Sequence, residues 1–304
     1  MKQIVVLSGK GGTGKTSLSA AFAHLASSGG TNVLVDADVD AANLELLLKA
    51  RRVKEEPFWG GSTAIIDQSR CSGCGTCQEV CRFDAVSVSD GEYLVDPVAC
   101  DGCAACVYAC PEQTITLEKQ QAGGWYISET AYGRFFHAHL LPAQENSGKL
   151  VAFIKRQAQD ALKEMDGDLM LVDGPPGIGC PVISAISGAD VVLIVTEPSL
   201  AGIHDLERVL GTAAYFQVPA WVCINKADLY REGAEQIRDI CQVREIPLLG
   251  EISYDLTIPR AMTAGEPVTL FAPDSGASRE IQAIWEKILL KLNDLHPAGT
   301  IIQL

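Results

Sequence analysis

Eight of the eleven cysteines in this 304-residue sequence fall into two short rows that share the spacing C-x2-C-x2-C-x3-C. The first row holds Cys71, Cys74, Cys77 and Cys81, and the second holds Cys100, Cys103, Cys106 and Cys110. Three thiolates at this spacing can hold three irons of a [4Fe-4S] cube, while the fourth reaches the cube of the other row. We therefore expect one cluster on Cys71, Cys74, Cys77 and Cys110, and a second on Cys100, Cys103, Cys106 and Cys81.

The two rows belong to an internal duplication, because residues 71–88 and 100–117 align without gaps at an offset of 29. Structural zinc is the alternative, but it usually takes two separated C-x2-C pairs around one ion instead of a close triplet plus one. The duplication resembles a bacterial two-cluster 4Fe-4S ferredoxin. One departure is Arg82, which stands where Pro111 follows the second row, so the two clusters can differ in surroundings and potential.

The beginning of the chain carries a second kind of chemistry. The pattern G-x-x-x-x-G-K-[ST] occurs as Gly9, Gly14, Lys15 and Thr16, between an apolar run and a helical stretch. Backbone N–H groups of such a loop wrap phosphates, Lys15 pairs with the β- and γ-phosphates, and Thr16 holds Mg²⁺. The expected nucleotide cradle comprises Gly11, Gly12, Thr13, Gly14, Lys15, Thr16 and Ser17.

A second lysine, Lys10, gives the loop the form GKGGTGKT. This string resembles the deviant Walker A motif of the MinD/Mrp/nitrogenase-iron-protein group of P-loop (SIMIBI class) ATPases. The resemblance implies a dimer in which Lys10 reaches the partner's nucleotide and acts like an arginine finger. Within DADVDAAN and LVDGPPGIG it further implies that Asp38 positions or deprotonates the attacking water and that Asp173 orders magnesium.

The same resemblance places the base near Asn225, in the string CINKAD, and puts Asn43 in the first switch beside Asp36 and Asp38. Because N-K-x-D also selects guanine in GTPases, GTP remains an alternative to ATP. The run GEISYDLTIPRAMTAGEPV resembles the segment that closes over the base, and VTEPSLAGIHDLERV resembles the interface helix.

Apolar, β-branched runs alternate with helical stretches, as in parallel strands linked by crossover helices. The expected strands are IVVLS, NVLVDAD, LMLVD, VVLIVT, WVCIN and PLLGE. The pattern predicts an α/β fold, with a mostly parallel P-loop sheet flanked by helices over residues 1–59 and 119–304. An inserted small α+β domain, bacterial-ferredoxin-like, is expected over 60–118, with FWGG and QQAGGW as hinges or boundaries.

Composition excludes several classes of function. The net charge is -14 and the basic residues are scattered, which disfavours nucleic-acid binding. No apolar run approaches the ~18 residues that span a bilayer, so no stable membrane insertion is expected. The chain starts directly with a strand and a glycine loop, so we expect a cytoplasmic protein. Near the end, one helical face is expected to pack on the sheet; it contains Ile281, Ile284, Trp285, Ile288, Leu289 and Leu292.

The remaining cysteines and histidines have no partners at useful spacing. Cys180 lies seven residues after Asp173, which resembles the spacing of a cluster ligand in the nitrogenase iron protein. One such cysteine per chain supplies only two thiolates per dimer, so a small buried thiol is expected instead. Cys223 and Cys241 are expected in the core. The histidines expected to be structural are His137, His139 and His204.

The whole arrangement resembles the MinD-superfamily ATPases that carry an inserted ferredoxin domain. This implies an ATP-hydrolysing dimer, of identical chains or with a related ATPase, whose hydrolysis is slow and stimulated by a partner. The nucleotide state would gate electron transfer through two 4Fe-4S clusters to a redox protein. The alternatives are an ATP-dependent iron-sulfur or metal-cofactor assembly or carrier protein, and a MinD-like spatial organiser.

Overall fold

The computed structural model describes residues 1–142, 144 and 146–295. The chain divides into two compact units. Unit 1 comprises Met1–Glu55, Trp125–His139 and the chain from Ser147 onward, and unit 2 comprises Glu56–Gly124 and Leu140–Asn146. Unit 2 is thus wider than the 60–118 segment expected for an insert, and it takes in a second stretch of chain.

The strands are β1 (Lys2–Ser8), β2 (Asn32–Asp36), β3 (Arg51–Ile66), β4 (Val86–Ser89), β5 (Glu92–Val95), β6 (Ile115–Thr130), β7 (Gly133–Leu140), β8 (Leu169–Pro176), β9 (Val191–Thr196), β10 (Ala220–Asn225) and β11 (Leu248–Ile252). The helices are α1 (Lys15–Ala26), α2 (Leu44–Leu47), α3 (Thr76–Glu79), α4 (Ala105–Ala109), α5 (Ser147–Glu164), α6 (Cys180–Ile186), α7 (Leu200–Tyr215), α8 (Arg231–Val243), α9 (Thr257–Ala264), α10 (Val268–Phe271) and α11 (Gly276–Leu295).

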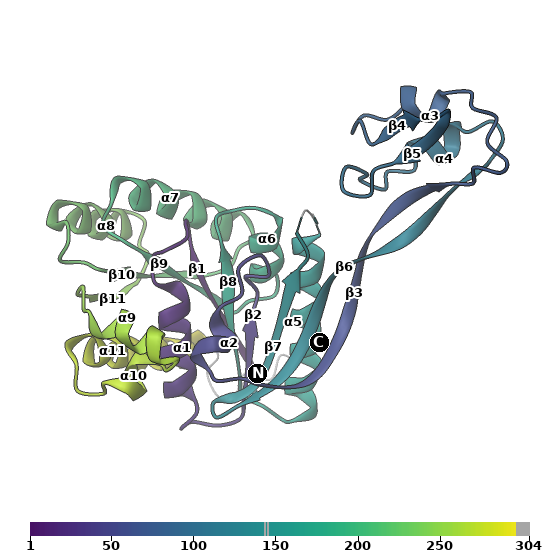
Figure 1. Ribbon diagram of the computed structural model, residues 1–304. Coiled ribbons are helices and arrows are strands. Elements are labelled where there is room, and N and C mark those ends of the chain that lie inside the picture. The colour runs from purple at the N-terminus through teal and green to yellow at the C-terminus, as the bar shows by residue number, and fades with distance from the viewer. Residues whose placement is uncertain (143, 145, 296–304) are drawn as a thin grey trace, which may run out of the picture. The chain divides into compact units, whose positions relative to one another are not determined.

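The main sheet has the strand order β11-β10-β9-β1-β8-β2-β7-β6-β3. The six apolar runs expected to be strands form β1, β2 and β8 to β11. The pairs β1–β8, β1–β9, β2–β8, β9–β10 and β10–β11 are all parallel. Helices α1, α10 and α11 lie on one face, and α5 to α8 lie on the other (Figure 1). The predicted α/β fold, with a mostly parallel sheet flanked by helices, is confirmed.

The core of unit 1 follows from the alternation of side chains along buried strands. Ile4 and Val6 of β1 point to the face covered by α1 and α11, where they join Phe22 and Trp285, whose rings stack at 5.5 Å. Four of the five apolar side chains that accompany Trp285 on the expected face of α11 are buried. Leu289 is 44% exposed, so that part of the prediction was wrong.

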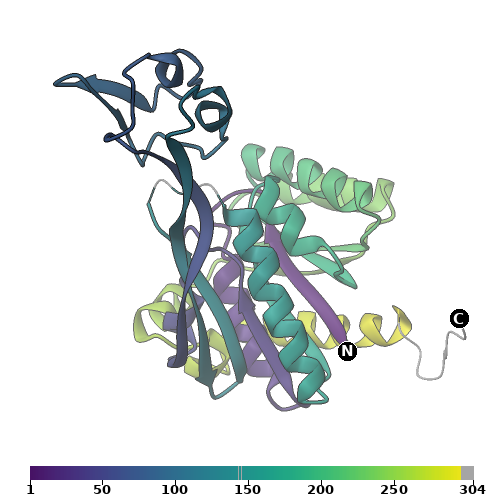
Figure 2. The same ribbon diagram turned by 90° about the vertical axis from the view of Figure 1, so that its right-hand side faces the viewer.

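Helix α5 is one of the crossover helices expected between the parallel strands. Leu150, Ile154 and Ala158 are fully buried, and the helix runs along β2 and β8 (Figure 2). None of the helices in the described ranges is long and apolar enough to cross a membrane.

Three strands of the main sheet escaped sequence analysis: β3, β6 and β7. The FWGG and QQAGGW stretches, expected to be hinges or boundaries, lie inside β3 and β6. Strand β3 contains a charge run, Pro57, Gly60 and Gly61, all of which weaken a strand signal. It is the edge strand of the sheet, where charge and proline are tolerated because one row of backbone groups faces water.

Unit 2 repeats its local backbone at the offset of the sequence duplication. Helix α3 begins at Thr76 and α4 at Ala105, and the residue before each is left-handed, with φ 81° at Gly75 and 64° at Ala104. Two further pairs of left-handed residues share the same offset: Gly73 with Gly102, and Asp84 with Gln113. The two rows of cysteines therefore sit on equivalent backbone.

Candidate nucleotide site and cysteine pockets

A cavity of about 860 Å³ lies where the loops after β1, β2, β8, β10 and β11 meet. These loops follow the carboxyl ends of parallel strands, the usual ligand position in an open α/β sheet. Its lining includes most of the expected nucleotide residues: Gly11, Gly12, Thr13, Gly14, Lys15, Thr16, Ser17, Asp38, Asn43 and Asn225. The segment expected to close over the base contributes Ser253, Tyr254, Asp255, Ile258, Pro259 and Met262.

Lys15 and Asp173 form the buried floor of this site. The Lys15 Nζ lies 3.0 Å from Asp173 Oδ1 and 3.8 Å from Asp38 Oδ2. Ser19 Oγ donates to Asp173 Oδ1 at 2.7 Å, while Asp173 Oδ2 is buried without a hydrogen-bond partner. A cation or its water ligands would satisfy this orphaned oxygen, as expected for the carboxylate that orders magnesium.

Burial and mutual repulsion set the charges of this floor. Burial, reinforced by the Asp173 carboxylate, raises the pKa of Asp36 to about 8. Burial also raises the pKa of Asp38, although Lys15 opposes the shift. Burial alone would lower the pKa of Lys15, but Asp173, Asp36 and Asp38 outweigh it and raise that pKa. Lys15 thus stays charged in a site that concentrates carboxyl groups.

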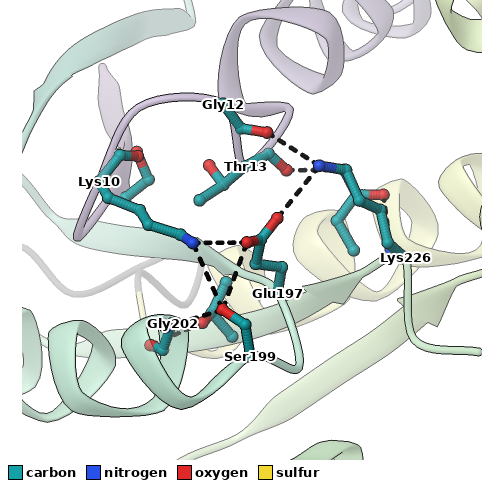
Figure 3. Close-up of polar contacts among 10 residues, drawn as sticks. Lys10, Gly12, Thr13, Glu197, Ser199, Gly202 and Lys226 are labelled. Atoms are coloured by element: carbon teal, nitrogen blue, oxygen red, sulfur yellow. Dashed lines mark hydrogen bonds and ion pairs between the residues drawn. The ribbon is translucent and has the colours of Figure 1, made fainter. Parts of the chain in front are cut away.

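Lys10 lies at the rim, outside the cavity lining, and is held within its own chain. Its Nζ lies 2.5 Å from Glu197 Oε1 and donates to Ser199 Oγ at 3.3 Å (Figure 3). The other carboxylate oxygen of Glu197 lies 3.0 Å from Lys226 Nζ, which also donates to the Gly12 carbonyl at 2.9 Å. Burial opposes ionisation of Glu197, but hydrogen bonds from Lys10 and Lys226 lower its pKa overall. Sequence analysis missed the roles of Glu197 and Lys226.

The two asparagines differ in how firmly they are placed. Asn225 is buried, and its Nδ2 donates to the Thr13 carbonyl at 2.7 Å. Gly14 has φ 93°, and a Cβ there would collide with that amide, so only glycine fits. Asn43 precedes α2 and donates to the Ala41 carbonyl at 2.8 Å.

Unit 2 contains two small pockets, each lined by four cysteines. One is lined by Cys71, Cys74, Cys77 and Cys110, and the other by Cys81, Cys100, Cys103 and Cys106. The fourth cysteine of each row thus lies in the pocket of the opposite row, which matches the crossed grouping expected from the spacing.

The pockets differ in their other lining. Ser72, Thr76, Tyr93 and Thr114 add hydroxyl groups to the pocket of the first row. The pocket of the second row is mostly apolar and includes Phe83, Val86, Val95 and Leu117. Within the pocket of the first row the thiols also differ from one another: a hydrogen bond with Thr76 lowers the pKa of Cys74, whereas burial raises the pKa of Cys77.

The three remaining cysteines are divided between the core and the surface. Cys223 in β10 and Cys241 in α8 are buried, as predicted. Cys180 is exposed at the start of α6, so the prediction of a buried thiol was wrong. The proline and glycines around Cys180 end β8 and begin α6 at the surface, a context that residue type alone does not reveal.

Comparisons with known proteins agree with this fold and site. Residues 4–268 match the family model described as the CobQ/CobB/MinD/ParA nucleotide binding domain. An uncharacterized protein of Methanocaldococcus jannaschii is 31% identical over 288 residues, which cover 94% of this chain and 96% of that protein. The septum site-determining protein MinD of Escherichia coli is 27% identical over 282 residues, 88% of this chain and 83% of MinD.

Among solved structures, MinD from Pyrococcus horikoshii complexed with Mg-ADP has a TM-score of 0.61 and 18% identity, and the match covers 97% of this chain and 99% of that one. At that identity the likeness shows the fold. The family match covers most of the chain and includes the loop that carries Lys15. The chain therefore belongs to the CobQ/CobB/MinD/ParA nucleotide-binding family and is an ATPase of the MinD/ParA type.

Proposed function

We propose that this ATPase acts as a dimer whose unit 2 carries two [4Fe-4S] clusters, and that its nucleotide state gates electron transfer to a partner protein. The observation that carries the proposal is the crossed grouping of cysteines in two pockets of unit 2. When bound, the clusters would supply one-electron redox chemistry. Residues Cys71, Cys74, Cys77 and Cys110 would hold one, and Cys81, Cys100, Cys103 and Cys106 the other.

The donor set fits a cube better than a single ion. A tetrahedral zinc ion bonds sulfur at about 2.3 Å, which draws its thiolates close together. Within the described ranges, the one group of three side chains placed to share a single metal ion contains no cysteine. A cube spreads its thiolates over four irons, so wider separation is expected. Hydrogen bonds to sulfur would tune it: the Ala85 N–H donates to Cys81 Sγ at 3.4 Å.

The position of each residue at the nucleotide cavity suggests the part it would play in ATP binding and hydrolysis. Backbone N–H groups of the loop before α1 would bind phosphates, with Lys15 on the β- and γ-phosphates and Thr16 on Mg²⁺. Asp173 would orient the waters of that ion through its unpartnered oxygen. Asp38 lines the cavity with a partly exposed carboxylate, which suits a group that positions the attacking water.

The ion pair of Lys10 supports a switch between free and paired chains. In the single chain, Lys10 is bound to Glu197 and Ser199. To stabilise a phosphoryl group in a partner, it must leave Glu197, whose charge Lys226 still neutralises. Hydrolysis by a lone chain should therefore be slow, and dimer formation should speed it.

Chain continuity offers a route from nucleotide to unit 2. The loop between Asp36 and Asn43 lines the cavity, α2 follows directly, and β3 begins at Arg51 before the chain enters unit 2. Movement of that loop on loss of the γ-phosphate would be passed along this segment.

The base is assigned as adenine. In the N-K-x-D reading, Asp228 would accept from the guanine amino group, but its Oδ1 accepts from the Tyr254 N–H at 2.6 Å, and Asp228 does not line the cavity. Asn225 does line it. Competition binding should therefore favour ATP over GTP, and Asp228→Ala should leave that preference unchanged. A preference for GTP that Asp228→Ala abolishes would reverse the assignment.

The cluster assignment is tested on anaerobically purified protein by iron and sulfide analysis and electron paramagnetic resonance. We expect about eight irons and eight sulfides per chain, as two cubes require. Serine replacements should affect the two signals in crossed pairs: Cys81→Ser should alter the same signal as Cys103→Ser, and Cys110→Ser the same signal as Cys74→Ser. The control, Cys180→Ser, should alter neither. Iron-free protein, or pairing of Cys81 with Cys74, would refute the assignment.

A carrier of clusters is a second candidate, favoured by the exposure of Cys74 and Cys103. An exposed thiolate can be displaced by an acceptor's thiol. Incubation with an apo acceptor distinguishes the two: stable retention of iron with and without Mg-ATP supports electron transfer, and ATP-dependent transfer supports delivery. A MinD-like organiser would instead bind liposomes in flotation with ATP.

A further inference from the structure

Three side chains of unit 1, all away from the nucleotide cavity lining, converge on one point. Glu45 comes from α2, and His137 and His139 come from β7. The His137 Nδ1 lies 3.5 Å from Glu45 Oε2, and the His139 Nε2 lies 3.6 Å from Glu45 Oε1. One ligand atom from each residue lies within 4.8 Å of the others. Two imidazoles and a carboxylate so placed form a three-ligand metal set.

One nitrogen of this cluster is buried and has no hydrogen-bond partner. His137 is fully buried, and its Nδ1 has no hydrogen-bond partner. Its other nitrogen, Nε2, lies 2.9 Å from Ser128 Oγ. A metal-binding histidine almost always bonds through its second nitrogen to a neighbouring polar group, which fixes the tautomer that leaves the first nitrogen free. With Nε2–H donating to Ser128, Nδ1 presents a lone pair toward Glu45.

We propose that Glu45, His137 and His139 bind a divalent first-row transition-metal ion, with Zn²⁺ as the ion that the donor set suits best. Two histidines and one glutamate are an established zinc set, with water in the fourth position. His139 is 37% exposed, so solvent and metal can reach the site from its side. His137 Nδ1 and His139 Nε2 lie near different oxygens of Glu45. A bound ion would therefore lie between the two rings and the carboxylate.

The surroundings hold the three ligands in place. The ring of Phe135 stacks on His137 at 4.6 Å, and that of Tyr126 stacks at 5.0 Å. Arg52 donates to Glu45 Oε2 at 3.0 Å and to Oε1 at 3.4 Å, and its guanidinium lies 4.1 Å from the centre of the Tyr126 ring. A carboxylate has about four acceptor positions, so Arg52 can orient Glu45 and leave lone pairs for an ion.

The protonation states suit metal binding. Burial lowers the pKa of His137 to about 4, so its ring is neutral at pH 7. Burial would raise the pKa of Glu45, but the hydrogen bond and the positive charge of Arg52 help to lower it overall. A neutral imidazole and an ionised carboxylate are the forms that bind metal.

A bound ion would join α2 to β7 within unit 1. Helix α2 begins at Leu44, whose N–H donates to Asp36 Oδ2 at 3.1 Å. The ion would thus hold the end of the loop that lines the nucleotide cavity. This makes the site a candidate for metal-dependent control of the first switch.

The test measures Zn²⁺ bound per chain by equilibrium dialysis of the full-length, anaerobically purified protein. Wild type should bind one Zn²⁺ more per chain than His139→Ala or Glu45→Gln. The matched control, His204→Ala, removes an exposed histidine of α7 and should bind as wild type does. Because wild type and the variants have the same cysteines, the difference in bound Zn²⁺ between them reports this site alone. Equal zinc binding by all four would overturn the proposal.

A thermal measurement covers the case in which a variant folds poorly. Added Zn²⁺ should raise the melting temperature of wild type and of His204→Ala, because a ligand that binds only the folded state stabilises it. His139→Asn, which keeps a polar side chain of smaller size, should melt at the same temperature with and without Zn²⁺. The same zinc-dependent rise in His139→Asn as in wild type would overturn the proposal.

Discussion

The nucleotide cavity of unit 1 gathers residues from distant parts of the chain, whereas three of the four cysteines in each pocket of unit 2 come from one short stretch and the fourth comes from its repeat. Lys15 and Asp173 meet across 158 positions, and thirty buried residues of one hydrophobic cluster support the sheet that brings them together. The hydrophobic cluster of unit 2 consists of Ala64, Ile66, Cys77, Val86 and Ile115. A core this small seldom stabilises a fold without a metal or a disulfide. We therefore expect the hydrophobic core of unit 1 to be sufficient for its folding, whereas the stability of unit 2 should depend on the metal that its cysteines bind.

The largest expected effect follows from removing iron. Chelation under reducing conditions should unfold unit 2, because cluster binding contributes folding free energy to a small unit. Unit 1 should keep its structure and still bind ATP. Hydrogen exchange would show that the rapid exchange of unit 2 includes the segment 56–124. Full protection of that segment after complete loss of iron would break the comparison.

The next effect concerns Lys10 in unit 1. We expect Lys10→Ala to lower ATP hydrolysis by about 10³-fold or more, the scale of losing an arginine finger. Phosphate release would measure the rate. The control is Lys49→Ala, which removes an exposed lysine bound to Glu266, and its rate should match wild type. An unchanged rate in Lys10→Ala would place the catalytic lysine elsewhere.

A smaller expected effect is a pH dependence of the stability of unit 1 that comes from one of its own buried side chains, His137. Burial lowers the pKa of His137 from 6.5 to about 4. Because the folded pKa lies below the unfolded one, the stability that neutral His137 contributes is present above pH 6.5 and lost as pH falls to 4. That loss amounts to about 3 kcal/mol at 1.36 kcal/mol per pKa unit.

Urea unfolding with added chelator would measure this loss. His137→Gln cannot be protonated in this range, so the stability of unit 1 should fall less steeply between pH 6.5 and 4 than in wild type. His204→Ala serves as the exposed-histidine control and should keep the wild-type slope. Identical slopes in wild type and His137→Gln would mean that another group carries the acid sensitivity.

The parallel strands and the grouping of the cysteines could be predicted from the sequence for different physical reasons. Five of the six apolar strands of unit 1, β1, β2 and β8 to β10, are buried on both faces, so they appear as nearly unbroken hydrophobic runs. Strand β3 escaped because it lies at the edge of the sheet, where charges and Pro57 mask the pattern. The crossed cysteine sets follow from spacing alone, since the repeat places equivalent residues on equivalent backbone.

Contacts between distant side chains that belong to no recognised motif could not be predicted from the sequence. Glu197 is an ordinary glutamate after a strand, and only the fold brings it to Lys10 and Lys226. Likewise, His137 and His139 have no ligand nearby in sequence, and Glu45 is 92 positions before His137. The exposure of Cys180 and Leu289 depends on how α6 and α11 turn against their neighbours, which periodicity gives only approximately.

The central claim, that the nucleotide site of unit 1 governs the clusters of unit 2, is tested by redox titration of anaerobic protein with Mg-ATP, with Mg-ADP and without nucleotide. We expect the midpoint potential or the reduction rate of at least one cluster to change with Mg-ATP in wild type. In Lys10→Ala, which should not form the active pair, the change should be absent. Identical potentials and reduction rates in all three conditions in wild type would contradict the account.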